Sequence, residues 1–347
     1  MLVSLAAGWV WRPAPTPLPG ESTGDADLAA RAVALVGRDR PALAVACVTP
    51  DAVRTAAIGA ARTDRFEIGS ISKGLTGLLL ADMIDRGEVS AGTRLGDLLP
   101  ATGAIGDVTL RQLATHTSGL PTQLPTVAQA GRNVLATLTA GNPYGGTPQQ
   151  RLDALVDVPL DSPPGTYSNL GFELLGAALA AAADRPYRDL LAERILRPSG
   201  LSDATVPYDA DELTERDLLG QTHGGRTNDA WLGEAMAPAG GVRADIDQLA
   251  AFAQLLLRER APGIDALEPK VSSDGEDPIG WAWMTTRSPV DDRAVVWHNG
   301  GTGGFTAYLG LDRERRVGVV IMSAKGEPPN PVTLSGFQLL HDVGDCA

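Results

Sequence analysis

The chain has 347 residues, enough for two domains or one large two-lobed unit, and a chain of this length can fold without a disulfide or a metal ion. Hydrophobic residues make up 44% and charged residues 20%, which excludes a wholly disordered chain, while 40 glycines and 25 prolines argue against a helical bundle or coiled coil. The net charge of −13 argues against binding to nucleic acid or to anionic lipid, because like charges repel.

The first 25 residues are predicted to form a separate N-terminal segment. Leu2 to Trp11 is an apolar run of ten residues, too short to span a bilayer and without the basic residues that open a signal peptide. The run is either the end of an export or anchoring segment or a simple packing segment, and the sequence supports both equally. Membrane association is therefore expected only through this segment. An extracytoplasmic or membrane-tethered location is slightly favoured over a cytoplasmic one.

The next part of the chain predicts two helices and a hairpin. The helices are expected at 28–35 and 71–86, the second with a broad apolar face and a glycine, Gly87, at its end. The hairpin joins β-prone stretches at 42–48 and 53–59 through residues that favour turns.

The remainder of the chain changes from helical to β-rich. Helices separated by long loops are expected at 109–115, 171–183, 189–196 and 245–258. Strands follow at 281–285, 294–298, 306–311 and 317–323, with a closing helix at 334–343. Strands at both ends predict an α+β fold in residues 26–347. One antiparallel sheet of N- and C-terminal strands is flanked by helices, with a mainly helical region inserted at about 75–270.

The two cysteines, Cys47 and Cys346, lie far apart and form no metal-binding pattern with each other or with histidine. A structural zinc site is therefore not expected. Free thiols are favoured over a disulfide, although the sequence does not show whether the two cysteines meet.

The best candidate for chemistry is Ser70-Ile71-Ser72-Lys73, at the start of the predicted helix 71–86. Residues three apart share a helix face. Serine needs an adjacent base, and a buried lysine with a lowered pKa can serve. The positive end of the helix dipole would lie where an oxyanion forms. Alone the motif is weak, because a serine at this position can simply cap the helix.

Two later motifs strengthen this interpretation. Tyr167-Ser168-Asn169 follows the turn-forming residues 163–165, and a phenol beside a lysine can exchange a proton while an amide binds a substrate carbonyl. His298-Asn299-Gly300-Gly301 ends a predicted strand. Glycines there allow a substrate to approach the strand edge, whose N–H can complete an oxyanion hole.

With these three motifs in this order, the chain resembles the serine β-lactamase and DD-peptidase superfamily, above all its class C branch and esterase relatives. The resemblance runs from about residue 28 to the C-terminus and includes accessory stretches at 66–70, 110–121 and 239–242. It implies a serine hydrolase that acts through an acyl-enzyme on an amide or ester of a small molecule or peptide, with no metal or cofactor.

The resemblance also implies a role for each motif residue. Ser70 would be the acylated nucleophile, Lys73 would take or relay its proton, and Tyr167 would be a general base or proton shuttle. Asn169 would orient Lys73 and the substrate amide. The N–H groups of Ser70 and Gly301 would form the oxyanion hole.

The third motif departs from the lysine-threonine-glycine pattern of the superfamily. His298 replaces the lysine and Asn299 the threonine, while Gly300 is kept. These three residues, with Asn169 and Gly301, are the expected substrate-binding residues. Because histidine is about half charged near pH 6.5, its attraction for a substrate carboxylate would be weaker than that of lysine and dependent on pH. Efficient hydrolysis of β-lactams is therefore in doubt.

Several activities stay open within this class. An esterase or amidase is the first choice, and a DD-carboxypeptidase or β-lactamase acting on peptidoglycan stem peptides or penicillins is the second. A penicillin-binding sensor that does not turn over is a rival of another class. The sequence does not decide whether the acyl group passes to water or to another acceptor. It also does not indicate the oligomeric state.

Other notable side chains have plainer interpretations. His116 is expected to be a buried structural residue. Arg243 is expected to be a solvated surface charge, with binding of a substrate carboxylate as the alternative. Four tryptophans are expected in the core or in the wall of the cleft, namely Trp231, Trp281, Trp283 and Trp297.

Overall fold

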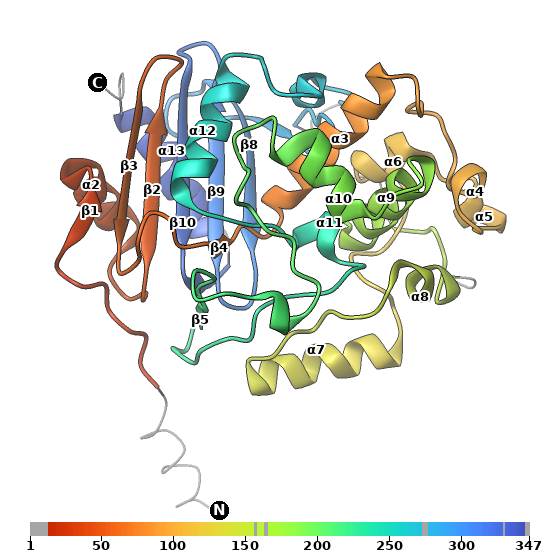
Figure 1. Cartoon of the computed structure of the whole chain (residues 1–347), viewed down its shortest axis with the longest axis horizontal. Coiled ribbons are helices and arrows are strands. Elements are labelled where there is room, and N and C mark those ends of the chain that lie inside the picture. Colours follow the sequence, from red (N-terminus) through yellow and green to blue (C-terminus); the bar gives the residue numbers. More distant parts are fainter. Residues whose placement is uncertain (1–12, 156–157, 163–165, 273–276, 329, 344–347) are drawn as a thin grey trace, which may run out of the picture.

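The computed structural model describes residues 13–155, 158–162, 166–272, 277–328 and 330–343 (Figure 1). Seven strands form one antiparallel sheet in the order β1-β3-β2-β10-β9-β8-β7. Their bounds are β1 Ser22–Gly24, β2 Leu43–Val48, β3 Val53–Ile58, β7 Met284–Arg287, β8 Ala294–Gly301, β9 Thr306–Asp312 and β10 Val317–Ser323. β2 pairs with β10 along its whole length, which joins the two ends of the chain and confirms the predicted α+β fold.

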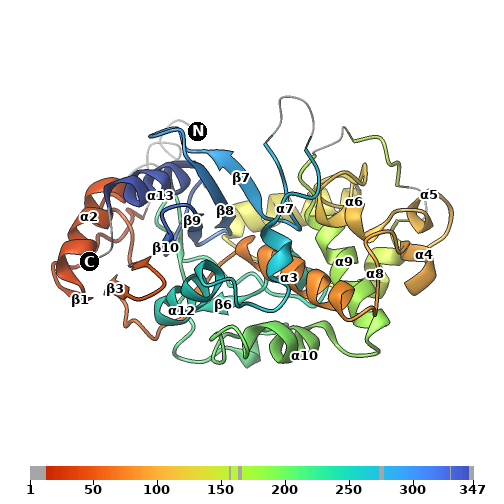
Figure 2. The ribbon, with the colours of Figure 1, turned by 90° about the horizontal axis from the view of Figure 1, so that it is seen from above.

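Helices cover both faces of this sheet (Figures 1 and 2). α2 (Ala26–Val36) and α13 (Asn330–Asp342) pack on one face, and α12 (Ile246–Leu257) packs on the other, with α3 (Ile71–Asp85) against the neighbouring strands β8 and β9. Successive residues of β2 alternate between the two apolar clusters. Because both faces are covered, all six residues of β2 are buried, which explains its continuous apolar sequence.

Between β3 and β7 the chain forms the helical region that the sequence predicts. Its central helix, α9 (Asn169–Ala182), is buried along Leu170 to Leu179 and packs on α3. The other α-helices of the region are α4 Leu95–Leu98, α5 Gly103–Gly106, α6 Leu110–Ala114, α7 Val127–Thr139, α8 Pro148–Asp153, α10 Tyr187–Leu191 and α11 Ala237–Gly240. Single turns of π- or 3₁₀-helix lie at Ala192–Leu196, Ala210–Glu212 and Ile264–Leu267.

Some boundaries differ from the sequence prediction. The strand expected at 281–285 begins only at Met284, because Ala282 has a φ of +70° and turns the backbone. The flanking Trp281 and Trp283 pack in the core instead, where Trp283 lies against Gly74 of α3. α13 begins four residues earlier than expected, with Pro331 in its first turn, where a proline is tolerated.

Two short ladders complete the fold next to the main sheet. β4 (Phe66–Glu67) pairs with β6 (Arg243–Ala244), and β5 (Gln221–Thr222) pairs with β11 (Lys325–Gly326). The first ladder matters for function, because Glu67 is followed directly by Ile68, Gly69 and Ser70.

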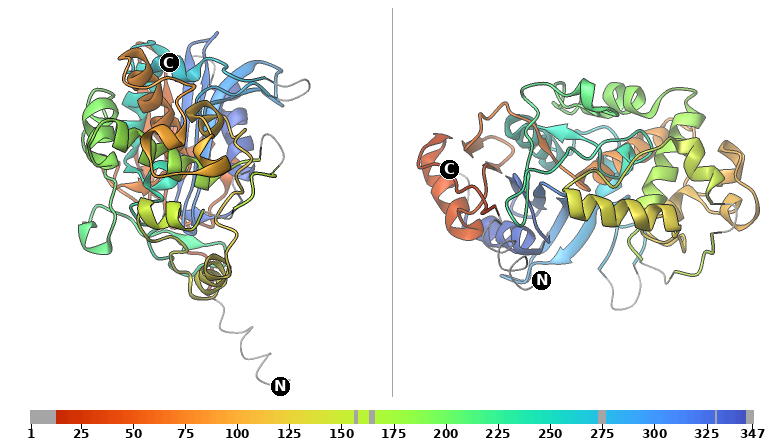
Figure 3. Two further views of the ribbon diagram at one scale, coloured as in Figure 1. Left: turned by 90° about the vertical axis from the view of Figure 1, so that its right-hand side faces the viewer. Right: turned by 90° about the horizontal axis from the view of Figure 1, so that it is seen from below.

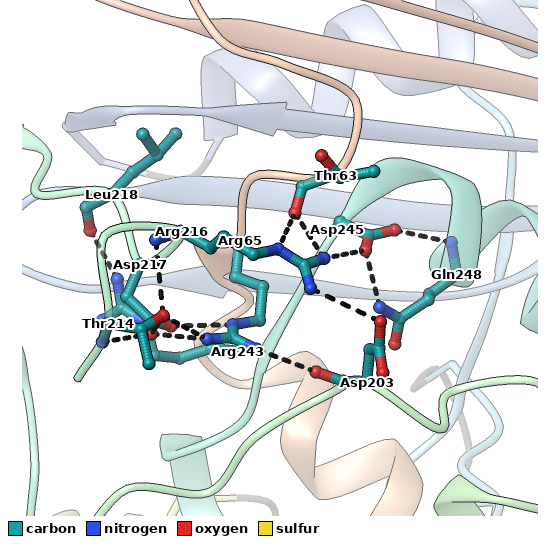
Figure 4. Close-up of polar contacts among 10 residues, drawn as sticks. All are labelled: Thr63, Arg65, Asp203, Thr214, Arg216, Asp217, Leu218, Arg243, Asp245 and Gln248. Atoms are coloured by element: carbon teal, nitrogen blue, oxygen red, sulfur yellow. Dashed lines mark hydrogen bonds and ion pairs between the residues drawn. The ribbon is translucent and has the colours of Figure 1, made fainter. Parts of the chain in front are cut away.

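A buried network of charged side chains holds the β4–β6 ladder (Figure 4). Arg65 donates to both carboxylate oxygens of Asp217, at 3.0 and 2.7 Å. Arg243 donates to Asp217 at 3.1 Å and to Glu67 at 2.9 Å. Both predictions for Arg243 are therefore wrong: its side chain is 1% exposed, and two carboxylates neutralise its charge. Glu67 also accepts the backbone N–H of Trp231 at 2.9 Å, so the network fixes two segments at once.

Replacing Arg243 by Met is expected to lower the free energy of unfolding by about 3–5 kcal/mol, because Glu67 and Asp217 would lose a partner in the dry interior. Urea unfolding of the two proteins measures this difference. Arg31→Ala is the control, since the ion pair of Arg31 with Asp27 is solvent-exposed and should contribute about 1 kcal/mol or less. Equal losses in the two variants would contradict the prediction.

Cys47 lies buried in β2 and is disulfide-bonded, so the interpretation as a free thiol is wrong for this residue. Cys346 and the apolar run at residues 2–11 lie outside the described residues. Within the described ranges, no helix combines the length and the hydropathy needed to cross a membrane.

Candidate active site

Ser70 stands immediately before α3 and directs its hydroxyl toward Lys73. Its backbone is already helical, with φ −66° and ψ −5°, and its side chain makes no capping hydrogen bond. The plainer interpretation, that Ser70 only caps the helix, is therefore not supported. Lys73 lies one turn later, and its Nζ donates to the Ser70 Oγ at 3.1 Å.

The Lys73 amine is held in a dry environment. The residue is fully buried, and Nζ also donates to Asn169 Oδ1 at 2.7 Å and to the Ala239 carbonyl at 2.6 Å. Burial lowers the pKa of Lys73 to about 7, although the carboxylate of Glu173 opposes this shift. A large share of the amine is therefore neutral near pH 7 and able to accept the proton of Ser70.

Tyr167 completes this group from the loop before α9. Its phenol lies beside the Ser70 side chain, which slightly lowers the phenol pKa, and its ring centroid lies 4.8 Å from Lys73 Nζ. Burial raises the pKa of Tyr167 well above its ordinary value. The phenol therefore stays protonated, which favours a proton shuttle over a phenolate base.

The start of α9 positions Tyr167 and Asn169. Ser168 caps the helix by accepting the Gly171 N–H at 2.9 Å, which makes Asn169 the first helical residue. His116 supports the loop: its Nδ1 accepts the Ser168 N–H at 3.1 Å, and its ring lies 4.5 Å from the Tyr167 ring. His116 is buried, as the sequence predicts, and burial lowers its pKa to about 3, so it is a neutral support.

The end of β8 packs directly on the residues that precede α3. A Cβ atom on Gly300 would lie 2.0 Å from the Ile68 carbonyl oxygen, and one on Gly69 would lie 2.7 Å from the Gly301 nitrogen. Gly69 also has a φ of +51°, which favours glycine. Two glycines thus allow the backbone nitrogens of Ser70 and Gly301 to lie on touching segments, as an oxyanion hole requires.

His298 lies behind this contact and differs from expectation in its charge. It is fully buried, with Nδ1 2.6 Å from the Asn299 carbonyl oxygen. Burial and the nearby Lys73 lower the pKa of His298 to about 3. The ring is therefore neutral throughout the physiological range, and the expected pH-dependent attraction for a carboxylate near pH 6.5 is absent at this position. Asn299 beside it donates to Thr333 Oγ1 at 2.8 Å.

These residues surround one cavity of about 450 Å³. Five of the predicted residues line it, namely Ser70, Tyr167, Asn169, Asn299 and Gly301, whereas Lys73, His298 and Gly300 are buried behind its wall. The sequence prediction missed Tyr144, Met236, Thr302 and Glu327, which also line the cavity and which no motif marks. Trp231, expected in the core or the cleft wall, is part of its wall.

Tyr144 brings a second phenol into this cavity. Its oxygen accepts Asn169 Nδ2 at 3.2 Å and Gln123 Nε2 at 3.0 Å, and its ring meets Trp231 edge to face. Burial raises the pKa of Tyr144 to about 12, so the hydroxyl keeps its proton. Because the oxygen already accepts two N–H groups, this proton is available to a ligand. Trp231 also borders a second cavity of about 800 Å³ that lies against α7.

Comparison with known proteins gives a consistent result. Residues 26–341 match the family model described as Beta-lactamase. The D-alanyl-D-alanine-carboxypeptidase/endopeptidase AmpH of Escherichia coli (strain K12) is 27% identical over 280 residues, which cover 74% of this chain and 69% of that protein. The Beta-lactamase of the same strain is 24% identical over 316 residues, covering 80% and 79%.

Two solved structures share the fold. A class C beta lactamase from Rhodobacter sphaeroides matches with a TM-score of 0.76 at 20% identity, over 92% of this chain and 99% of that chain. The D-alanine carboxypeptidase AmpC from Burkholderia cenocepacia matches with a TM-score of 0.73 at 22% identity, over 91% and 99%.

Proposed function

The chain belongs to the β-lactamase family and is a serine hydrolase that acts through an acyl-enzyme, and from this premise we propose that Ser70 is its nucleophile and that its substrate is an ester or amide of a small molecule or peptide. The observation that carries the proposal is the hydrogen bond of the buried Lys73 amine to Ser70 Oγ at 3.1 Å, with the Tyr167 phenol beside the same side chain in one cavity.

The reaction proceeds in two steps. Ser70 Oγ attacks the carbonyl carbon while its proton passes to the neutral Lys73 amine, and the N–H groups of Ser70 and Gly301 stabilise the oxyanion. The bond to the leaving group then breaks, and the leaving group takes a proton through Tyr167. Water then adds to the acyl carbonyl and gives a proton to Lys73 and Tyr167. The bond to Ser70 Oγ breaks, Oγ takes this proton back from the same two groups, and the acid leaves.

The charges around the cavity favour substrates without a carboxylate beside the scissile bond. Glu327 is the one charged side chain among the described residues that line the cavity, and its carboxylate is paired with Arg40 at 3.1 Å and Lys325 at 3.5 Å, so the lining offers a substrate carboxylate no unpaired cation. His298, at the position where a lysine would attract a carboxylate, is neutral and buried. An esterase or amidase is therefore the first choice.

A second candidate is a DD-carboxypeptidase or β-lactamase that acts on peptidoglycan stem peptides or penicillins. AmpH, one of the relatives, is a D-alanyl-D-alanine-carboxypeptidase/endopeptidase by name. The second cavity next to Trp231 also offers space for an extended peptide.

A substrate panel tests the choice. The expected kcat/KM for 4-nitrophenyl butyrate exceeds that for nitrocefin by about 10–100-fold. Nitrocefin carries a carboxylate, and this factor corresponds to the one charge-assisted hydrogen bond that the site does not offer to it. Ser70→Ala protein provides the blank for spontaneous hydrolysis. Faster cleavage of nitrocefin or of a D-Ala-D-Ala peptide would favour the second candidate. A penicilloyl adduct that forms and persists, with no turnover of any substrate, would identify a sensor.

A further inference from the structure

Three amide side chains connect helix α7 to the Tyr144 hydroxyl in the active-site cavity. α7 lies along the lower edge of the molecule in Figure 1, and Figure 3 shows it from below. On this helix Gln129 is buried, and its Nε2 donates to Asn133 Oδ1 at 2.9 Å. Asn133 Nδ2 donates to Gln123 Oε1 at 2.8 Å, and Gln123 Nε2 donates to the Tyr144 oxygen at 3.0 Å. These three amides, here called the amide relay, each accept on one side and donate on the other.

The direction of the amide relay is fixed at its far end. Arg132 Nη2 donates to Gln129 Oε1 at 2.8 Å, and a guanidinium group has no acceptor. Gln129 Nε2 also donates to the Pro143 carbonyl oxygen at 3.2 Å, and a carbonyl has no donor. Turning any one amide of the relay round would set two donors or two acceptors against each other. Gln123 therefore directs its N–H, and not its oxygen, at Tyr144.

A second N–H reaches the same phenol oxygen from the catalytic residues. Lys73 Nζ donates to Asn169 Oδ1 at 2.7 Å, so Asn169 Nδ2 faces the other way and donates to the Tyr144 oxygen at 3.2 Å. The two N–H groups occupy both lone pairs of this oxygen. Burial raises the pKa of Tyr144 to about 12, so the phenol keeps its proton, which has no acceptor within the described part of the chain. The hydroxyl is therefore a donor only, and it belongs to the wall of the cavity.

Tyr144 is also held in place before a substrate binds. Its ring lies 5.1 Å from the Trp231 ring, edge to face, and its backbone N–H donates to Asn142 Oδ1 at 2.9 Å. Asn142 Nδ2 in turn donates to the Leu232 carbonyl at 2.8 Å. A donor that is already fixed loses little conformational entropy when a ligand binds to it.

We propose that Tyr144 selects substrates whose acyl group carries a second carbonyl oxygen, to which the phenol donates its proton in a hydrogen bond; this inference rests on the proposed function. The acyl group is the part concerned because it stays attached to Ser70 through both steps, whereas the leaving group departs after the first. Since both lone pairs of the phenol oxygen are occupied, an N–H group of a substrate finds no acceptor at this position. The site thus favours an acceptor over a donor in the acyl group.

Two esters that differ by one carbonyl group, 4-nitrophenyl 4-oxopentanoate and 4-nitrophenyl pentanoate, test this proposal. The ratio of their kcat/KM values is measured in each protein, so that their intrinsic reactivities cancel when proteins are compared. In Tyr144→Phe the ratio is expected to fall about tenfold, the factor for one hydrogen bond. Tyr308→Phe is the matched control, because this hydroxyl is buried in β9 away from the cavity and has no hydrogen-bond partner among the described residues. Its ratio should equal that of the unchanged enzyme.

Two variants of Gln123 separate the direction of the phenol proton from the shape of the cavity. In Gln123→Glu a carboxylate replaces the amide N–H and attracts the phenol proton away from the substrate. The ratio should therefore fall as in Tyr144→Phe, although the phenol is still present. Gln123→Met removes the amide without supplying an acceptor, so it should keep the ratio of the unchanged enzyme.

Labelling of Ser70 with a fluorophosphonate gives the concentration of folded, active protein in each case. Equal changes for both esters in Tyr144→Phe would overturn the proposal, because a purely structural phenol affects both substrates alike. So would a ratio that is retained in Gln123→Glu or lost in Gln123→Met. If the unchanged enzyme neither hydrolyses the esters nor takes the label, the proposed function is overturned, and this inference falls with it.

Discussion

Replacing Ser70 by Ala is expected to lower kcat by about 10⁶-fold, the loss that follows removal of a serine nucleophile in comparable enzymes. In the proposed mechanism the Ser70 hydroxyl alone forms the acyl bond, and the oxyanion hole and Lys73 act only on a bond that it makes. Hydrolysis of 4-nitrophenyl butyrate gives the rate. Mass spectrometry after treatment with a fluorophosphonate gives the site of labelling.

Ser72→Ala is the matched control for this experiment. Ser72 lies two residues further along the same segment and is fully buried, and its Oγ accepts the Val242 N–H at 3.1 Å. Its loss should weaken the fold by about 1 kcal/mol and leave labelling intact. A fluorophosphonate adduct that persists in Ser70→Ala, or that disappears in Ser72→Ala while the protein stays folded, would contradict the assignment of the nucleophile.

Replacing Lys73 by Met is expected to lower kcat/KM by about 10²–10⁴-fold, the contribution typical of general acid–base catalysis. The effect on the pH profile is more specific than the loss of rate. Because burial lowers the pKa of Lys73 to about 7, the charged amine dominates below pH 7 and the neutral amine above it. The kcat/KM of the unchanged enzyme should therefore rise from pH 6 to pH 8 and then level off.

The Lys73→Met variant should lose this rise in kcat/KM between pH 6 and pH 8, the acid limb of the profile, in addition to its loss of rate. Lys73→Arg serves as the companion variant: it keeps the positive charge, but a guanidinium cannot be deprotonated in this range. It should therefore be as inactive as Lys73→Met. An acid limb that survives in Lys73→Met would assign the titration to another group, and a profile that is flat in the unchanged enzyme would rule out Lys73 as the base.

The residues that meet in the cavity can be selected from the sequence because they lie in local motifs. Ser70 and Lys73 are one helical turn apart, and Asn169 follows a capping serine, so each pair is placed by short-range geometry. The fold is predictable for a similar reason. β10 is a short and mostly apolar run, and such a run is typical of a strand that is buried on both faces.

The residues that the sequence prediction missed depend on distant parts of the chain. The sequence predicts Arg243 as a surface charge because its partner Glu67 lies 176 positions away and meets it only in the folded chain. Tyr144 enters the cavity from a loop that no motif marks, and only its hydrogen bond with Asn169 reveals its position. The charge of His298 also depends on tertiary structure, because burial and Lys73 set its pKa at about 3.

The pairing of β2 with β10 has a consequence for biosynthesis. Leu43 lies opposite Ser323, so the centre of the sheet joins strands 280 positions apart. During translation the edge of β2 that pairs with β10 has no partner until almost the whole polypeptide has left the ribosome. Such high contact order slows folding. Truncation before β10 should therefore yield an aggregating product and not a smaller active enzyme.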